Sequence, residues 1–314
     1  MSLLKLIGAP IRYRLWRPRH LGLIAADITG VARQPAGEHR VHVQALVDWL
    51  CRAQDVREGC PDAGGVSAGW SFEDGWLPSY PETSGYIVET LLAAADVLAR
   101  DDLRARALRI IDWELSIQNA DGSFPGHFGE PGSRPVIFNT GQIIHGMVAG
   151  FVDRGRGDCL ESAVKAGHWM ARCQDPDGCW QRNVHNDVPH TYNTRAAWGL
   201  LRAGLLSGED SLQRAGERNL RWALTRQTPS GWFAANAFRE GHTPFTHTIA
   251  YAIRGLLEGG ALLEDGPLLD AARRAATALA RVQRADGWLA GTYGDNWMAG
   301  SRYCCLTGLA QMVL

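Results

Sequence analysis

The sequence lacks any apolar run long enough to cross a membrane. A spanning helix needs about 20 apolar residues in succession, and no stretch of these 314 residues approaches that length. The amino-terminal segment also lacks the uninterrupted apolar core of a signal peptide, because arginines stand at positions 12, 14, 17 and 19. These absences predict a cytoplasmic protein without a transmembrane segment. A basic amphipathic segment can also lie on a membrane surface, so weak peripheral membrane contact stays open beside the alternative of an arm packed on the domain.

The chain also has almost no net charge and no cysteine framework. The formal net charge is −1, so no overall basic field would attract nucleic acid. The seven cysteines are odd in number, and no two CxxC pairs stand where they could face each other, which favours reduced thiols over disulfides. Cys173 with Cys179, and His185 with Asp187 and His190, lack the spacing of a known metal site. We therefore predict no cofactor and leave a metal ion open.

Strand patterns are missing as well, and an internal repeat stands in their place. No run alternates convincingly between apolar and polar residues, and nothing resembles the punctuation of a βαβ unit. Four segments share a Gln followed four residues later by Gly, and they read QNADGSF from Gln118, QDPDGCW from Gln174, QTPSGWF from Gln227 and QRADGWL from Gln283. A degenerate copy begins near Gln54. Repetition on this scale indicates stacked supersecondary units.

Each repeat predicts a helical hairpin. An amphipathic helix precedes the Gln, a tight turn with Asp-Gly or Ser-Gly follows it, and a polar loop leads to a second, more apolar helix. The second helices carry fewer charges and more small residues, so we expect them to form an inner ring inside the first set. The predicted fold is all-α, a single (α/α) toroid of about five to six hairpins. We assign residues 51–314 to the toroid and residues 1–50 to an amino-terminal arm or helix packed on it.

The repeat resembles a known motif. The pattern Gln-x-x-x-Gly-x-Trp, complete at Gln174, Gly178 and Trp180, resembles the QW motif of triterpene cyclases. Residues 50–314 as a whole are similar to the α/α toroid shared by terpenoid cyclases, protein prenyltransferase β subunits and several carbohydrate-active enzymes. The segment GWLPSYPETSGYIVETLL also resembles uncharacterised toroid proteins of bacterial polysaccharide-biosynthesis loci. The resemblance implies the fold, and because such a fold hosts several chemistries the function must be argued from the site.

Two chemistries found among the resembling families lack their motifs here. The Asp-x-Asp-Asp acid motif of class II terpene cyclases is absent, and so are DDxxD diphosphate motifs. The segment RYCCLTGLAQ resembles the inner helix that bears the zinc-binding His of protein prenyltransferases, but the matching position near Ser301 holds no His. The resemblance therefore supports the helix and weakens the zinc site. An isoprenoid-handling enzyme, prenyltransferase-like or cyclase-like, is kept as an alternative.

Polar residues gather where the inner helices are expected to begin. Side chains of Ser, Thr and Asn suit helix caps there, and capping would account for Thr83, Thr140, Thr194 and Ser301. Capping does not account for Glu82, Tyr192, His247 and Arg302 at one level of the ring. Five helix N-termini that point into one basin would also favour an anionic ligand. Polar side chains among flat aromatic rings are what a sugar site requires.

We therefore predict a carbohydrate-active enzyme, either a glycoside hydrolase or a polysaccharide or oligosaccharide lyase, that binds an oligosaccharide or other small molecule, with an anionic ligand favoured. A hydrolase needs two carboxyl groups at a fixed separation, whereas a lyase abstracts a proton with His or Tyr while Asn and Arg neutralise a uronate. The candidate catalytic residues are Glu82, His190, Tyr192, His247 and Asp295. The candidate substrate-binding residues are Trp76, Tyr80, His127, Asn139, His185, Asn193, Arg195, His242, Trp297 and Arg302. A non-catalytic glycan-binding toroid is the remaining alternative, and it predicts no paired carboxylates within catalytic distance and no perturbed carboxyl group or His in the mouth.

Overall fold

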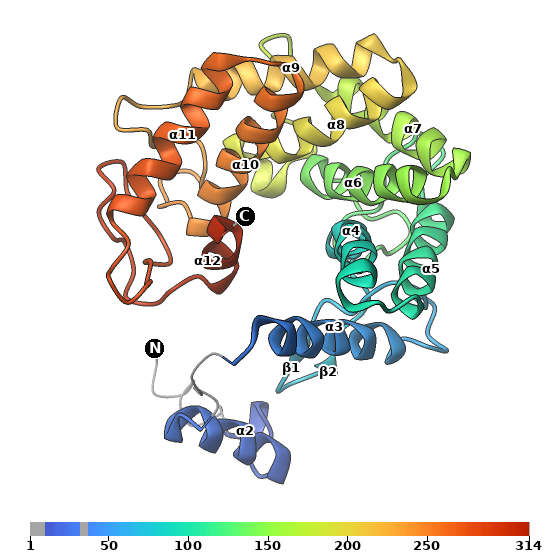
Figure 1. Cartoon of the computed structure of the whole chain (residues 1–314), viewed down its shortest axis with the longest axis vertical. Helices are drawn as coiled ribbons and strands as arrows, with labels where there is room; N and C mark the ends of the chain where they lie inside the picture. Colours follow the sequence, from blue (N-terminus) through green and yellow to red (C-terminus); the bar gives the residue numbers. More distant parts are fainter. Residues whose placement is uncertain (1–9, 32–36, 314) are drawn as a thin grey trace.

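The computed structural model describes residues 10–31 and 37–313, and in them helices alternate between two concentric arrays (Figure 1). The outer array contains α3 (His39–Asp55), α5 (Asp102–Ile117), α7 (Gly157–Cys173), α9 (Asp210–Leu224) and α11 (Gly266–Arg281). The inner array contains α4 (Pro81–Leu98), α6 (Ile137–Arg154), α8 (Thr194–Ser207), α10 (Thr246–Leu262) and α12 (Leu306–Val313). The predicted α/α toroid of helical hairpins is confirmed, and the arc of described hairpins runs from α3 round to α12.

The burial of the helices follows the predicted division into inner and outer rings. On the inner helix α6 every residue from Ile137 to Gly150 is buried. On the outer helix α9 only one face is buried, with Leu212, Ala215 and Leu220 among its members. An inner helix is covered by an outer helix on one side and by inner neighbours on the others, whereas an outer helix keeps a solvent face for its charges.

Small residues let the inner helices approach one another closely. A Cβ added to Gly146 of α6 would lie 2.2 Å from the carbonyl oxygen of Gly85 on α4. A Cβ added to Gly255 of α10 would lie 2.3 Å from the carbonyl carbon of Thr194 on α8. No side chain fits at these two positions. The glycines therefore allow the short distance between neighbouring inner helices.

The remaining elements lie at the amino-terminal end and in the loops. They are α2 (Pro18–Thr29), the antiparallel pair β1 (Trp70–Ser71) and β2 (Gly75–Trp76), and the short 3₁₀ helices η1 (His185–Asp187) and η2 (Thr191–Asn193). Figure 1 shows α2 outside the arc, on the far side of α3. Since α3 runs through residue 50 and packs on α4, it continues the outer array; the division into an arm and a toroid stays a prediction. Within residues 10–31 and 37–313, no helix combines the length and apolarity needed to cross a membrane.

In three of the four repeats the Gln ties its turn to the next outer helix. The Gln174 Nε2 donates to the carbonyl oxygen of Gly178 in its own turn, at 3.1 Å, and to that of Ala215 on α9, at 2.8 Å. Gln118 and Gln227 make the equivalent pairs of hydrogen bonds. The Gly supplies a positive φ, +90° at Gly178, that the turn requires. The repeat is therefore explained by packing between neighbouring hairpins.

Replacement of Gln174 by alanine is expected to lower the free energy of unfolding by about 1–3 kcal/mol, because the Gly178 and Ala215 carbonyl oxygens each lose one donor and the Arg218 guanidinium loses its acceptor. Gln283→Ala is the matched control, since the Gln283 Nε2 donates only within its own turn, to Gly287 at 2.8 Å in an exposed setting. Denaturant unfolding of both variants measures the difference. Equal losses would contradict a bridging role for the repeated Gln.

Candidate functional site

A cavity of about 280 Å³ lies at the N-terminal ends of the inner helices. It brings together six residues that the sequence singled out, and these are Tyr80, Glu82, Asn139, His185, Tyr192 and His247. Val136, Phe138, Phe238, Thr248 and Tyr251 complete its lining. We call it the central cavity. Its position matches the level at which polar helix N-termini were expected to converge.

The polar residues at this level do not serve as helix caps. The helices α4, α6, α8 and α10 begin at Pro81, Ile137, Thr194 and Thr246, and none has a side-chain cap hydrogen bond. The Thr83 hydroxyl donates backwards to the Tyr80 carbonyl oxygen at 3.2 Å, and the Thr194 hydroxyl donates across to Ala252 at 3.2 Å. Ser301 bonds to Tyr303 in its own loop. The capping interpretation of Thr83, Thr140, Thr194 and Ser301 is therefore wrong, because the first helical residues turn their hydroxyls to other carbonyl oxygens or leave them without a cap bond.

Glu82 presents a carboxyl group with a perturbed pKa. The Tyr80 hydroxyl donates to Glu82 Oε2 at 3.1 Å, and Asn139 Nδ2 donates to the Tyr80 hydroxyl oxygen at 3.5 Å. Burial raises the pKa of Glu82 to about 7, and the Tyr80 hydrogen bond and the charge of Arg195 limit that rise. At neutral pH both the protonated and the ionised form of Glu82 are therefore well populated.

The two histidines among the catalytic candidates are held neutral. Burial lowers the pKa of His247 to about 4, and its Nδ1 lies 3.4 Å from the Cys305 Sγ. Burial also lowers the pKa of His190 to about 4. His190 does not line the cavity: its ring stacks behind Tyr192 at 4.4 Å, and its Nε2 lies 2.8 Å from the His185 carbonyl oxygen. His190 thus positions Tyr192, while His247 faces the cavity itself.

The central cavity is more aromatic than the sequence indicated. The Phe138 ring packs edge-on against Tyr192 at 5.1 Å and lies 5.4 Å from Tyr251. Phe238 lies 5.5 Å from His247. Phe138, Phe238 and Tyr251 were not among the sequence candidates; the spacing of four between His247 and Tyr251, which puts both on one helix face, was the available signal.

Arg195 sits on α8 next to the central cavity without a carboxylate partner in the described part of the chain. Its Nε donates to Gln142 Oε1 at 2.6 Å, and one Nη donates to Gln311 Oε1 at 3.3 Å. The guanidinium lies 5.1 Å from the ring of Tyr251, and burial lowers the pKa of Arg195 from its ordinary value. A poorly solvated cation bonded only to amide oxygens favours an anion nearby.

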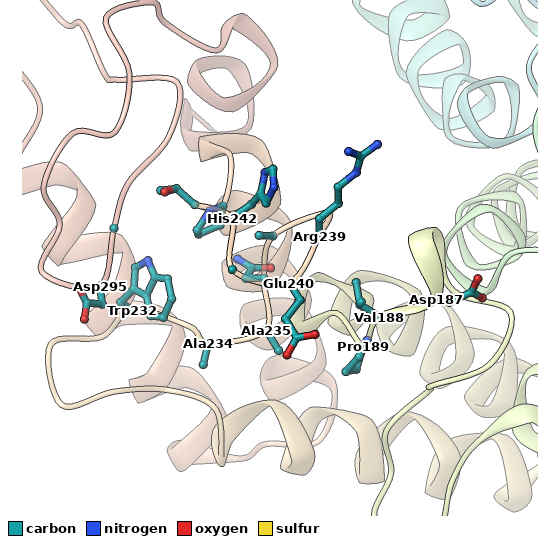
Figure 2. Close-up of a pocket in the computed structure, with 16 residues that line it drawn as sticks. Asp187, Val188, Pro189, Trp232, Ala234, Ala235, Arg239, Glu240, His242 and Asp295 are labelled. Carbon is teal, nitrogen blue, oxygen red and sulfur yellow. The ribbon is translucent and has the colours of Figure 1, made fainter.

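A larger outer pocket of about 680 Å³ lies among the loops, lined by residues 187–189, 232–244 in part and 294–295. Figure 2 shows Trp232 beside Asp295 at one end, Glu240 near Pro189, and Asp187 at the other end. The sequence candidates His242 and Asp295 lie here. A third pocket of about 450 Å³ contains Phe238, Arg239 and His242 and so adjoins both the central cavity and the outer pocket.

The structure places the two carboxyl groups among the catalytic candidates in different pockets. Glu82 lines the central cavity, and Asp295 lines the outer pocket. Among the residues that line the central cavity, Glu82 is the one that carries a carboxyl group. The central cavity therefore supplies a single acid–base carboxyl group and does not supply the pair required for hydrolysis between two carboxylates.

The other candidates lie outside the cavity. Trp76 packs on Trp49 with ring centroids 5.5 Å apart. Trp297 is buried, and its Nε1 donates to the Ser230 carbonyl oxygen at 2.9 Å. Asn193 is buried at the start of α8, and His127 and Arg302 are exposed. In this geometry Trp76 packs its strand on α3, and Trp297 joins two loops.

No metal centre is formed by the described residues. Within residues 10–31 and 37–313, no group of three or more His, Cys, Asp and Glu side chains is arranged to hold a metal ion. The loop with His185, Asp187 and His190 illustrates why: the exposed Asp187 carboxylate pairs with Arg134 at 2.7 Å, and His190 turns to the His185 backbone.

Comparison with known proteins identifies one family. The family model described as "Squalene-hopene cyclase C-terminal domain" matches residues 78–258, which is more than half of the chain. No curated protein matches the sequence.

Solved structures with a similar fold include several sugar enzymes. The unsaturated glucuronyl hydrolase of Bacillus sp. GL1, responsible for glycosaminoglycan degradation, is similar with a TM-score of 0.61 at 15% identity, over 86% of this chain and 77% of that one. Cellobiose 2-epimerase from Bacillus thermoamylovorans B4167 gives a TM-score of 0.61 at 11% identity, over 79% and 74%. A polysaccharide lyase gives 0.54 at 13% identity, over 85% and 82%. At these identities the similarity shows the fold.

Proposed function

From the premise that this chain belongs to the squalene-hopene cyclase C-terminal domain family, a family of α/α toroids, we propose that it is a carbohydrate-active enzyme with its reaction in the central cavity. Three sugar enzymes of different chemistry share the toroid at low identity, which makes the fold compatible with such a role. The observation that carries the proposal is Glu82, a carboxyl group with a pKa of about 7 in a polar and aromatic cavity. A general acid or base works best when its pKa lies near the working pH.

The perturbed pKa of Glu82 favours an enzyme over a binding protein. A non-catalytic glycan-binding toroid gains nothing from a desolvated carboxyl group that titrates near neutrality, since burial of an ionisable group costs stability. The Tyr80 hydroxyl holds that carboxyl group in one orientation, and Asn139 holds the Tyr80 hydroxyl. Such a chain of supporting hydrogen bonds is expected around a group that must exchange a proton at a fixed place.

The single carboxyl group favours a lyase-type step. In the proposed reaction the ionised Glu82 takes the proton from the carbon next to a sugar carboxylate. The electron pair forms a carbon–carbon double bond as the neighbouring bond to the leaving sugar oxygen breaks, and the Tyr192 hydroxyl gives a proton to that oxygen. Asn139 and Arg195 supply a hydrogen bond and positive charge for the sugar carboxylate. The reaction needs no second carboxyl group, unlike paired-carboxylate hydrolysis.

One observation favours a second candidate, an isoprenoid-handling enzyme. Tyr192, Phe138 and Tyr251 place aromatic faces around one protonatable acid. Aromatic faces attract cations, which suits a carbocation formed after protonation of an alkene. Asn139 and the charge of the neighbouring Arg195 favour an anionic sugar as the substrate over an isoprenoid.

A thermal-shift screen with coupled turnover assays tests the proposal. The probes are uronate-containing oligosaccharides, neutral oligosaccharides and prenyl diphosphates, each with and without zinc or magnesium. A ligand at about 100 times its Kd stabilises the folded state by about 2.7 kcal/mol. We expect a shift with uronate oligosaccharides and a product with a new conjugated double bond. A shift confined to prenyl diphosphates would replace the sugar proposal by the isoprenoid one.

A further inference from the structure

The described amino-terminal residues 10–31, here called the N-terminal segment, expose an unusual amount of apolar surface. The exposed fractions are 73% for Ile11, 62% for Trp16 and 79% for Ile28, and Leu21 and Leu23 are also about half exposed. Leu21 and Ile28 stand seven residues apart on one side of α2. A large exposed apolar patch beside polar groups marks an interaction surface.

Specific contacts orient the N-terminal segment. His20 is buried and meets the rings of Trp70 and Phe72 at 5.4 and 5.0 Å. Arg12 pairs with Glu73 at 2.8 Å. The segment is thus held on the loop that contains β1 and β2 by His20 and Arg12, while Trp16, Leu21 and Ile28 stay exposed.

The charge of the N-terminal segment favours a negatively charged partner. Residues 10–31 contain four arginines and one aspartate, although the whole chain has a net charge of −1. Arg17 and Arg19 are exposed among the apolar side chains. A second copy meeting the same surface would bring its arginines against these, and such juxtaposition of like charges is unfavourable. A surface that carries negative charge above an apolar layer satisfies both the arginines and the apolar side chains.

We propose that the N-terminal segment docks this protein on an anionic lipid bilayer, with Trp16, Leu21 and Ile28 in the interface and the arginines at the headgroups. Tryptophan is suited to this position because its ring is apolar and its N–H reaches the polar layer. Docking by this segment leaves the central cavity untouched, so it is independent of the proposed reaction.

Vesicle co-sedimentation of the full chain tests the proposal. We expect binding to vesicles of phosphatidylcholine with 30% phosphatidylglycerol, weak binding to pure phosphatidylcholine, and loss of binding at high salt. Arg14→Glu with Arg17→Glu is expected to weaken binding at least about tenfold, since each basic residue near the surface contributes on the order of 1 kcal/mol. Trp16→Ala should weaken binding to the anionic vesicles at low salt, because it removes an apolar contact with the interface.

The matched control is Arg214→Glu with Arg273→Glu, which makes the same charge change at exposed positions of α9 and α11. This variant should sediment as the unaltered chain does, and circular dichroism should show that both double variants are folded. Equal binding to neutral and anionic vesicles, or equal loss in both double variants, would overturn the proposal. So would a dimer in solution that Trp16→Ala dissociates, because the segment would then be an interface between copies.

Discussion

Glu82→Gln is expected to lower turnover by about 10²–10⁴-fold, the usual contribution of a general acid or base. Glutamine keeps the size of the side chain and can still accept from the Tyr80 hydroxyl, but it cannot take up or release a proton. Steady-state kinetics on the substrate found by the ligand screen measure the loss. Glu161→Gln, an exposed position on the outer helix α7, is the control and should leave turnover unchanged. A fully active Glu82→Gln would remove Glu82 from the mechanism.

The same substitution has a pH signature in stability that does not require a substrate. Burial raises the pKa of Glu82 from 4.5 to about 7 in the folded state. The folded state then holds a proton that the unfolded state has lost, so stability from this group falls as pH rises from about 4.5 to 7. Glu82→Gln removes this pH-dependent loss of stability. The melting temperature of the variant, measured relative to that of the unaltered chain, should therefore rise as the pH increases from about 4.5 to 7. A constant difference from pH 5 to pH 8 would show that Glu82 titrates normally.

Gly146→Ala is expected to cost on the order of 3 kcal/mol or more of folding free energy, because overpacking a close contact forces backbone shifts. The added Cβ would lie 2.2 Å from the Gly85 carbonyl oxygen. Backbone atoms cannot rotate away as a side chain can, so α4 and α6 must separate. Because Glu82 and Asn139 stand on these two helices, substrate binding should weaken together with stability.

Gly22→Ala is the matched control for this experiment. Gly22 lies within α2 and has nothing within 4 Å of an added Cβ. There alanine should be neutral or stabilise by about 0.5–1 kcal/mol, through helix propensity. Denaturant unfolding of both variants gives the comparison, and a Gly146→Ala variant as stable as the control would contradict a glycine-mediated crossing.

The sequence determined the helical architecture because the signals for it are local. Amphipathic periodicity, Asp-Gly turns and the repeated Gln recur within each hairpin, and a repeat must bury one face on its neighbour. The recurrence of the motif that contains Gln174 indicated that neighbouring hairpins pack on one another. The Gln174 Nε2 forms that contact between hairpins, because it donates one hydrogen bond to its own turn and one to the next outer helix.

The sequence also placed Glu82, Asn139, Tyr192 and His247 at one level of the ring, since each stands at or near the start of an inner helix. It could not decide whether Asp295 joins them, because Asp295 stands in the loop before the last inner helix, nearer to its repeat turn than the other residues are to theirs. Only the tertiary structure puts Asp295 in the outer pocket, where the Ser230 hydroxyl donates to its carbonyl oxygen, and Glu82 in the central cavity. The loops are irregular, so no periodicity in the sequence fixes where their side chains point.

The sequence by itself thus determined the ring of hairpins and the level of the candidate site, because both follow from short-range patterns repeated along the chain. Tertiary structure alone decided which side chains share the cavity and how they titrate. The pKa of Glu82 depends on desolvation by the surrounding cavity wall, on the Tyr80 hydroxyl, and on the charge of Arg195, which comes from the distant helix α8. Desolvation and charge act through space, and sequence separation carries little information about either.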